Sequence, residues 1–261
     1  MTESVTFYEF IKVGRMDKDY RLIHLEDLSF HYPGGEPVLK NIHFQLHEKE
    51  RVGLIGPNGS GKTTFFHLIM GLLRPTSGRI EIFEKEMRVE KDFETIRQQI
   101  GLLFQDADDQ LFSPTVLEDV AFGPLNQGKS VGDAKGIARA TLSALGLSGF
   151  EGRITHKLSG GEKKLVSLAT VLAMEPRVLL LDEPTSGLDA DTTERIVNIL
   201  KGLDIPYIFI SHNIDFISQT ANQIYGMADG HIFLEEKKTV HSHDHSHEYG
   251  QLPHIHSHKN G

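Results

Sequence analysis

The chain contains no cysteine among its 261 residues. It therefore has no disulfide framework and no thiolate metal site, which fits a reducing compartment. It also lacks any run of about eighteen apolar residues, so no segment is expected to span a membrane. The first residues lack the basic start and the apolar run of a signal peptide. If the protein works at a membrane, other chains must supply the membrane-spanning part.

Positive charge is also scarce. The chain has 27 Lys and Arg against 36 Asp and Glu, which gives a formal net charge of −9. Proteins that bind nucleic acid or anionic lipid broadly usually carry a basic excess. The charge balance therefore argues against a nucleic-acid partner. The length is sufficient for one large α/β domain or two small ones.

Residues 56–64 fit the P-loop pattern of Gly, four free positions, Gly, Lys and Ser/Thr. Apolar residues precede the motif at 51–55 and follow it at 65–70, which predicts strand, loop and helix in that order. Lys62 is expected to reach the β- and γ-phosphates, and Thr63 to ligate Mg²⁺. The glycines let backbone N–H groups approach phosphate oxygens, and the helix adds its positive dipole end. The predicted phosphate-binding residues are Gly56, Pro57, Asn58, Gly59, Ser60, Gly61, Lys62, Thr63 and Thr64.

Two adjacent carboxylates, Asp182 and Glu183, end a second apolar segment, which consists of the four residues 178–181 after Arg177. Such a run predicts a central parallel strand that is buried on both faces. Ligands bind at the carboxyl edge of these sheets, where the P-loop also lies. Burying two carboxylates is costly unless a cation or a reaction uses them. We expect Asp182 to hold Mg²⁺, directly or through water, and Glu183 to act as general base toward an attacking water.

Two further apolar segments, at residues 100–104 and 206–210, are predicted strands that end at Gln105 and at His212 with its neighbours. His212 is expected to lie on the same sheet edge as the two carboxylates, where it could contact a γ-phosphate. Residues 222–235 predict a hairpin around an Asp-Gly turn.

Alternating apolar residues at 22–32 and 42–46 predict a small antiparallel sheet. A short strand is expected at 78–83 and a short helix at 92–99. Tyr32 ends the first of these strands. On position alone it is either a ring that stacks on a nucleotide base or an ordinary edge-strand aromatic.

Residues 106–157 change character and show helical periodicity, which predicts a helical insertion. Within it, Thr115 is expected to cap a helix together with Glu118. Three acids occupy a polar loop in the same segment, and we interpret them as solvated carboxylates rather than metal ligands. These acids are Asp106, Asp108 and Asp109.

Residues 158–162 read Leu-Ser-Gly-Gly-Glu and open a helix that is expected to run to about residue 174. Ser159, Gly160 and Gly161 lie where a helix N-terminus offers bare N–H groups, which makes this a second possible anion site. Ser-Gly-Gly before a helix is also common N-cap chemistry, and the segment by itself does not decide between the two.

The chain thus divides into an extension at residues 1–20, an α/β domain at 21–236 and a tail at 237–261. The predicted α/β domain is a P-loop NTPase with a central, mostly parallel sheet, a small antiparallel β subdomain and a helical subdomain at about 106–175. The tail crowds histidines between Ser and Asp, and neutral imidazoles at that density bind Ni²⁺, Co²⁺, Cu²⁺ or Zn²⁺. A disordered solvated tail and a purification tag are the alternatives. The histidines concerned are His241, His243, His245, His247, His254, His256 and His258.

Taken together, and in this order along residues 22–233, the motifs resemble the nucleotide-binding subunit of an ATP-binding cassette (ABC) transporter. The resemblance implies that Tyr32 stacks on the adenine of ATP and that Gln105 contacts Mg²⁺ and senses the membrane partner. It implies that the 159–161 segment binds the γ-phosphate of ATP held by a second subunit, and that Asp189 links the two active sites across the dimer. The motifs are the P-loop, Gln105, Leu158-Ser-Gly-Gly-Glu162, Asp182-Glu183-Pro184, Ser186-Gly-Leu-Asp189 and His212.

Within that family, residues 103–124 most resemble the ATPases of cobalt and nickel uptake systems of the energy-coupling-factor type, and the histidine-rich tail points the same way. The sequence departs from the family at Glu162, where Gln is usual, and at Leu165, where Arg is frequent. Glu162 could place a negative charge close to the bound phosphate, so it leaves the strength of that contact open.

The sequence therefore predicts an ATPase that uses ATP and Mg²⁺ at the cytoplasmic face of the cell membrane. It is expected to power the integral membrane subunits of an importer and to pair with a second ATPase subunit of the same or a related kind. One alternative is a soluble ABC ATPase in metal or cofactor assembly. Another is a metal-storage or metal-sensing protein that works through its tail. The single P-loop and the short 105–159 interval disfavour translation factors and repair proteins of the family.

Overall fold

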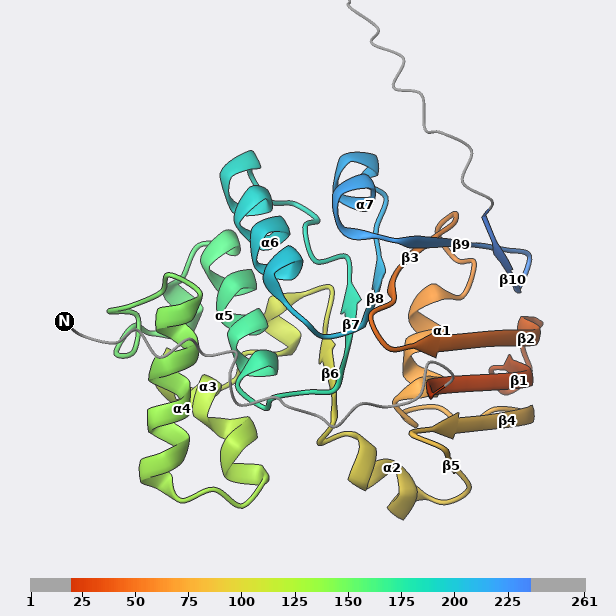
Figure 1. Ribbon diagram of the computed structural model, residues 1–261, viewed down its shortest axis with the longest axis horizontal. Helices are drawn as coiled ribbons and strands as arrows, with labels where there is room; N and C mark the ends of the chain where they lie inside the picture. Colours follow the sequence, from red (N-terminus) through yellow and green to blue (C-terminus); the bar gives the residue numbers. More distant parts are fainter. Residues whose placement is uncertain (1–19, 236–261) are drawn as a thin grey trace, which may run out of the picture.

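The computed structural model describes residues 20–235. The predicted extension at residues 1–20, except for Tyr20, and the predicted histidine-rich tail lie outside the described residues. Within 20–235 two sheets and their flanking helices form the predicted α/β architecture (Figure 1). No helix in this part of the chain has both the length and the apolar character needed to traverse a bilayer.

The larger sheet has six strands in the order β10-β9-β3-β8-β7-β6. The strands from β9 to β6 pair in parallel, whereas β10 runs antiparallel to β9 as the second arm of the predicted hairpin. The predicted central, mostly parallel sheet is therefore confirmed. Its strands are β3 (Arg51–Ile55), β6 (Ile100–Leu103), β7 (Val178–Asp182), β8 (Tyr207–Ile210), β9 (Gln223–Ala228) and β10 (His231–Leu234).

The smaller sheet is antiparallel and has the order β2-β1-β4-β5. It corresponds to the small antiparallel sheet that the alternating apolar residues predict. Apolar side chains of these strands point to one face and are buried against the helix after the P-loop, so this sheet covers one side of that helix (Figure 1). The strands are β1 (Arg21–His31), β2 (Pro37–His47), β4 (Ser77–Ile82) and β5 (Lys85–Glu86).

Within residues 20–235, seven α-helices lie between the strands. Figure 1 shows α3, α4, α5 and α6 on the side of the six-stranded sheet away from the antiparallel sheet. Residues between β6 and β7 are thus largely helical, as expected, although the subdomain limits at 106 and 175 stay a prediction. The helices are α1 (Lys62–Ile69), α2 (Glu90–Ile96), α3 (Val116–Asn126), α4 (Val131–Ala144), α5 (Gly160–Leu172), α6 (Ala190–Gly202) and α7 (Ile214–Thr220).

The helix expected at residues 92–99 instead forms α2, which begins at Glu90 and ends at Ile96. The reason lies in Asp92, whose carboxylate accepts the N–H groups of Arg88 and Val89 at 3.1 Å each. Asp92 therefore lies in the first turn and caps the helix from inside, and the helix begins two residues before it. By contrast, Thr115 caps α3 as predicted, with Glu118 Oε2 accepting its N–H at 3.1 Å.

The six-stranded sheet separates two hydrophobic cores because side chains alternate along each strand. On β7, Val178 and Leu180 are buried toward α1 and the antiparallel sheet, whereas Leu179 and Leu181 are buried toward α3, α5 and α6. The strand is buried on both faces, as its unbroken apolar run predicts. Packing on both faces fixes the position of Asp182 at the end of the strand.

Candidate active site

The P-loop, Gln105, Asp182 and His212 come together at the edge of the six-stranded sheet where the parallel strands end. Register determines this placement, since Leu103 of β6 pairs with Leu181 of β7 and Asp182 pairs with Ile210 of β8. The loops that follow β3, β6, β7 and β8 therefore leave the sheet at the same level. This is the edge where ligands bind in open α/β sheets.

The P-loop connects β3 to α1, as its flanking residues predict. Gly56 has a φ of 152°, and a Cβ there would lie 2.1 Å from the carbonyl oxygen of Met227. Gly61 caps α1 with a φ of 102°, and a Cβ there would lie 2.7 Å from a methyl carbon of Leu39. Both positions therefore need glycine for their conformation and for the close approach of neighbouring atoms.

The P-loop carries polar groups that suit an anion. Ser60 is buried, and its Oγ has no hydrogen-bond partner within the described residues. A buried hydroxyl left unpaired is unfavourable, and a phosphate oxygen would satisfy it. Lys62 Nζ donates to the carbonyl oxygens of Gly56 at 2.8 Å and Pro57 at 2.9 Å. Burial lowers the pKa of Lys62, with Glu183 and Asp182 opposing that shift.

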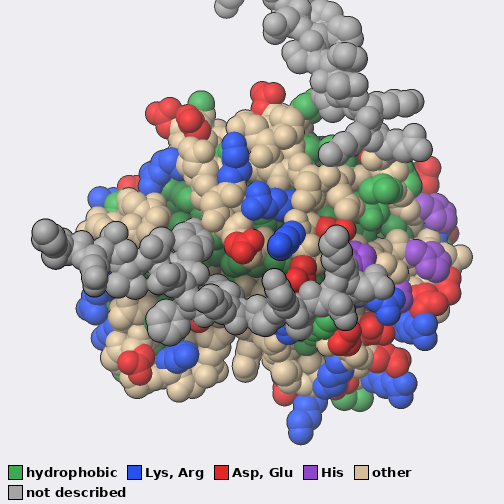
Figure 2. Space-filling view, in the orientation of Figure 1, with side chains coloured by type: hydrophobic (Ala, Val, Ile, Leu, Met, Phe, Trp, Pro, Cys, Tyr) green, Lys and Arg blue, Asp and Glu red, His purple; other side chains and the backbone are tan. Residues whose placement is uncertain are grey.

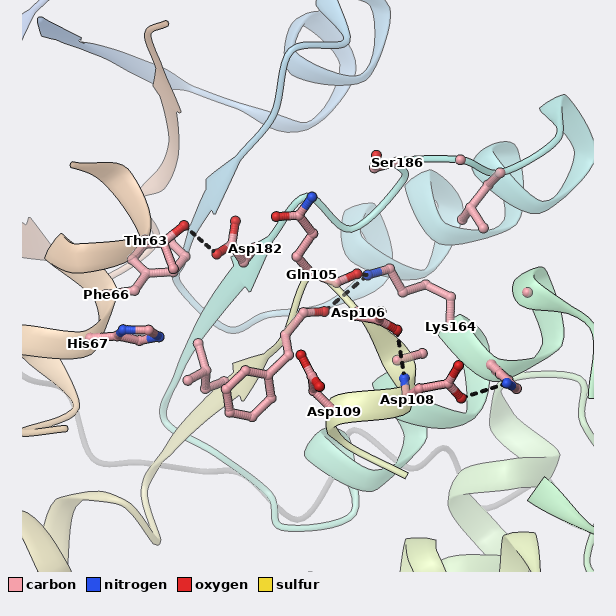
Figure 3. Close-up of a pocket in the computed structure, with 17 residues that line it drawn as sticks. Thr63, Phe66, His67, Gln105, Asp106, Asp108, Asp109, Lys164, Asp182 and Ser186 are labelled. Carbon is pink, nitrogen blue, oxygen red and sulfur yellow. Dashed lines mark hydrogen bonds and ion pairs between the residues drawn. The ribbon is translucent and has the colours of Figure 1, made fainter. Parts of the chain in front are cut away.

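A cavity of about 800 Å³ lies beside the P-loop, and Thr63, Gln105 and Asp182 are among the oxygen-bearing side chains that line it. The Thr63 hydroxyl donates to Asp182 Oδ2 at 2.9 Å, which joins residues 119 positions apart (Figure 3). Asp182 is buried, and this burial raises the pKa of its carboxyl group. Hydroxyl, carboxylate and amide oxygens are ligands that Mg²⁺ accepts. The three residues present therefore fit the predicted magnesium ion.

Glu183 follows directly on β7 and has a φ of 45°, in the left-handed region that non-glycine residues rarely adopt. Such strain concentrates at functional sites. Its side chain is 13% exposed, and burial raises the pKa of the carboxyl group. Nε2 of His212 lies 3.4 Å from Glu183 Oε1, so the two residues meet at the sheet edge where they are expected. Their roles in hydrolysis stay predictions.

Tyr32 lies beside the helical end of the P-loop. Its hydroxyl is 3.3 Å from Thr64 Oγ1, and its ring packs edge-on against Phe30 with 4.9 Å between centroids. The residue is 45% exposed. Both interpretations of Tyr32 remain compatible with this position.

The start of α5 holds the Ser-Gly-Gly segment. Ser159 and Glu162 cap each other: Glu162 Oε2 accepts the Ser159 N–H at 2.8 Å, and Ser159 Oγ accepts the Glu162 N–H at 3.3 Å. The N–H groups of Gly160 and Gly161 lie in the first helical turn and have no intrahelical acceptor. Gly160 lines the cavity that also contains Thr63 and Asp182, whereas Ser159, Gly161 and Glu162 do not.

Arg153 neutralises the unusual glutamate of this segment. Its Nη1 lies 2.7 Å from Glu162 Oε1, and its guanidinium packs 3.6 Å from the centroid of the Phe150 ring. The Ser159 N–H, and after it Arg153, lower the pKa of Glu162. The negative charge that Glu162 could bring close to a bound phosphate is therefore already paired within the chain. Sequence inspection missed Arg153 because no motif contains it.

Asp189 caps α6. Its carboxylate accepts the Thr192 N–H at 2.8 Å and the Thr192 hydroxyl at 2.9 Å. A Cβ on Gly161 would lie 2.9 Å from the same Thr192 hydroxyl, so the starts of α5 and α6 touch at this point. Asp189 is thereby held beside the Ser-Gly-Gly segment, and its predicted role across a dimer stays a prediction.

The acidic residues of the 106–109 loop make local contacts. Asp106 accepts the N–H of Asp108 at 2.9 Å, and Asp108 pairs with Lys163 of α5 at 2.5 Å.

Residues 20–235 contain no group of three or more His, Cys, Asp or Glu side chains arranged to hold a metal ion. Figure 2 shows histidine side chains over the antiparallel sheet on this face of the molecule. The seven predicted tail ligands from His241 to His258 lie outside the described residues.

Lys164 is a further cavity residue that the sequence did not single out. It is 3% exposed, and its Nζ donates to the carbonyl oxygens of Phe104 at 3.1 Å and Gln105 at 2.7 Å (Figure 3). Burial lowers the pKa of Lys164 to about 8. The available signal was a lysine at a core-facing position of the α5 pattern, which is unusual for a charged residue.

Comparison with known proteins agrees with this geometry. The sequence profile of the family described as "ABC transporter" matches residues 39–186, more than half of the chain. A putative ABC transporter ATP-binding protein of Nitratidesulfovibrio vulgaris is 49% identical over 236 residues, covering 90% of this chain and 86% of the relative. The energy-coupling factor transporter ATP-binding protein EcfA of Methanothermobacter thermautotrophicus is 44% identical over 218 residues, covering 82% and 70%.

Two solved structures are similar along most of their length. The structure of cbiO1 from Clostridium perfringens, described as part of the ABC transporter complex cbiONQ, has a TM-score of 0.74 at 35% identity and covers 83% of this chain and 88% of its own. A dimeric ATP-binding cassette in a post-hydrolysis state, bound to ADP and Pi, has a TM-score of 0.75 at 28% identity and covers 82% and 98%. The predicted resemblance to energy-coupling-factor ATPases is thus confirmed, and the chain belongs to the ABC transporter family as an ATP-hydrolysing subunit.

Proposed function

We propose that this chain powers an energy-coupling-factor importer that takes up cobalt or nickel ions. The observation that carries the proposal is the similarity to cbiO1 of the cbiONQ complex, supported by 44% identity to EcfA. The metal substrate rests on residues 103–124 and on the histidine-rich tail of the sequence. On this proposal the chain is a peripheral subunit at the cytoplasmic face of the membrane.

In the proposed reaction the P-loop binds the phosphates of ATP. Lys62 exchanges its carbonyl contacts for the β- and γ-phosphates, and Tyr32 stacks on the adenine. Thr63, Asp182 and Gln105 would hold Mg²⁺, which when bound offsets charge on the phosphates. Glu183 accepts a proton from the attacking water, and a raised pKa brings the group nearer to the operating pH of a general base.

His212 completes the hydrolytic site. Its ring lies within 3.4 Å of Glu183 and is half exposed, so it can contact both the base and a γ-phosphate. The imidazole limits the positions that the Glu183 carboxylate can adopt, and the strained backbone at Glu183 aims the carboxylate in the same way. These two constraints hold the base in place before the substrate binds.

A second ATPase subunit is part of the proposal because the chain carries two anion-binding elements. The P-loop is one, and the Ser-Gly-Gly segment at the start of α5 is the other. Two chains packed head to tail would place each segment on the ATP of its partner. A related cassette is dimeric with ADP and Pi bound, which supports this arrangement.

The contact with the membrane subunit is proposed to involve Phe112 and Phe122. They are 66% and 43% exposed and pack edge to face, with 4.7 Å between ring centroids. Buried Asp119 accepts the N–H groups of Phe112 and Ser113, at 3.2 and 2.8 Å, and so holds the aromatic pair in place. The aromatic pair follows the Gln105 segment along the chain. This position fits the proposed role of Gln105, which is to sense the membrane partner.

The test is to express the full chain with candidate membrane subunits and to measure co-purification, ATPase activity and metal uptake with competing ions. Co-purification with a hydrophobic membrane protein and ATP-dependent uptake of cobalt or nickel support the proposal. Capture of a soluble partner alone contradicts the transport function. Deletion of residues 241–261 separates the tail from the ATPase, since unchanged metal uptake would make the tail accessory.

A further inference from the structure

The loop of residues 104–110, here called the Gln105 loop, leaves the sheet after the last residue of β6. Leu103 still pairs with Leu181 in the ladder, but the next two carbonyl groups lie beyond it. Carbonyl oxygens outside the ladder need another hydrogen-bond donor, from the protein or from water. Lys164 supplies it to both, from the first turns of α5.

Position 164, on α5, is occupied by a lysine although the side chain is buried. Lys164 is 3% exposed, and burying an ammonium group is unfavourable unless nearby groups compensate. The compensation comes from two carbonyl oxygens of the Gln105 loop and from the charges of Asp182, Asp106 and Glu183. The cation is therefore held between α5 and the carboxylates at the sheet edge.

The remaining contacts of the Gln105 loop with α5 are made by side chains. Gln110 Nε2 donates to the Ser167 carbonyl at 2.8 Å, and its Oε1 accepts the N–H of Phe104 at 3.2 Å. Lys163 pairs with Asp108, whose side chain is 66% exposed. Among the contacts named here between the loop and α5, only the hydrogen bond from Lys164 reaches the backbone of Gln105 itself.

We infer that Lys164 is a positioning residue that fixes the backbone of Gln105 relative to the start of α5. Gly160 lies four residues before Lys164 on the same helix, which is about 6 Å along its axis. Helix α5 thus joins Gln105, which is proposed to contact Mg²⁺, to the Ser-Gly-Gly segment, which is proposed to contact the partner's ATP. The inference rests on the proposed role of Gln105 in ATP hydrolysis.

This connection has a mechanical consequence. When α5 moves toward or away from the partner's nucleotide, Lys164 carries the Gln105 carbonyl with it. Conversely, displacement of the Gln105 loop by a membrane subunit shifts α5 and its Ser-Gly-Gly segment. Lys164 therefore couples the ATP site at the P-loop of its own chain to the ATP of the partner, which the Ser-Gly-Gly segment contacts.

The test compares four full-length variants: Lys164→Met, Gln105→Ala, the double variant, and Lys163→Met as the matched control. Methionine keeps the length of Lys164 and removes its donors. Hydrogen–deuterium exchange of the 104–110 segment is measured without nucleotide, and the ATPase rate is measured against Mg²⁺ concentration. We expect faster exchange and a Mg²⁺ requirement raised by about tenfold for Lys164→Met, because small displacements of positioned groups have effects of at least this size. Lys163→Met should change both readouts less than Lys164→Met does, since its ion pair ends at Asp108, whose side chain is 66% exposed, and does not reach the backbone of Gln105.

The double variant decides whether Lys164 acts through Gln105. If Lys164 acts through Gln105, the double variant should have the same Mg²⁺ requirement as Gln105→Ala alone. If the two residues act independently, the increases in Mg²⁺ requirement of the two single variants should multiply in the double variant. Wild-type exchange and Mg²⁺ requirement in Lys164→Met, or multiplied effects in the double variant, overturn the inference. A Gln105→Ala variant with normal kinetics instead refutes the proposed role of Gln105. If Lys164→Met does not fold, Lys164→Arg is expected to shift both readouts in the same direction by less, and unchanged readouts overturn the inference.

Discussion

Replacement of Glu183 by Gln is the sharpest test of the proposed chemistry. The amide keeps the size of the side chain and its place beside His212, 3.4 Å away, but it cannot accept a proton from water. A positioned general base contributes about 10²- to 10⁴-fold to a rate, so kcat should fall by this factor. At about 1.4 kcal/mol for each tenfold, the barrier rises by about 3–5 kcal/mol. ATP binding should persist, because the P-loop residues are unchanged.

The same variant should be more stable than the wild type at neutral pH. Burial raises the pKa of Glu183, so the folded chain binds the proton more tightly than the unfolded chain does. Between the two pKa values stability falls as pH rises, and above both the full penalty of ionising the buried carboxylate is present. Glutamine does not ionise and avoids this penalty. The stability difference should therefore disappear below the ordinary pKa of a glutamate.

Single-turnover hydrolysis, binding of a fluorescent nucleotide and thermal unfolding at about pH 7.5 and about pH 4 measure these effects. Hydrolysis by Glu183→Gln at the wild-type rate would remove Glu183 from the mechanism. A variant that is less stable than the wild type at neutral pH would refute the burial argument instead. Asp182→Asn serves as the comparison, since it alters the neighbouring carboxylate, which is also buried, and should weaken Mg²⁺ use.

Three further predictions address the ligand and the partners. Tyr32→Ala should raise the KM for ATP by about tenfold with little change in kcat, because base stacking is worth about 1–3 kcal/mol, and Tyr32→Phe should behave as wild type. Arg153→Ala should leave the melting temperature nearly unchanged, since exposed ion pairs contribute about 0–1 kcal/mol, yet raise the ATP concentration needed for dimerisation in light scattering. Adding Glu162→Gln to Arg153→Ala should restore dimerisation, and failure to do so contradicts the charge argument. Phe112→Ser should reduce co-purification with membrane subunits while the isolated ATPase keeps its rate within about twofold, and normal assembly would dismiss the aromatic contact.

Much of the candidate site at the edge of the six-stranded sheet was predictable because its residues follow apolar strands. The end of a buried strand fixes where the next side chain lies, so the relative placement of Asp182, Glu183 and His212 follows from strand boundaries and parallel pairing. The P-loop was predictable for the same reason, since its motif lies between β3 and α1.

Residues that act through tertiary contacts were not predictable. Lys164 lies 59 residues from Gln105 in the chain, and its pairing with the Gln105 loop depends on how α5 packs. No helix was predicted over α6 and α7, although α6 had a capping residue in Asp189 and buried apolar residues at helical spacing. The limits of α2 were wrong because a carboxylate inside the first turn, rather than a residue before it, forms the cap.

The position of β3 has a consequence for how the chain is made. β3 carries the P-loop, and its two neighbours in the sheet are β8 and β9, which begin at Tyr207 and Gln223. During synthesis about 150 further residues are therefore added after β3 before the first residue of either neighbouring strand is made. Until then both of its edges are open to pairing with other chains. A growing chain cannot complete its nucleotide site before nearly the whole domain has left the ribosome, so premature termination yields a segment prone to aggregate rather than a smaller ATPase.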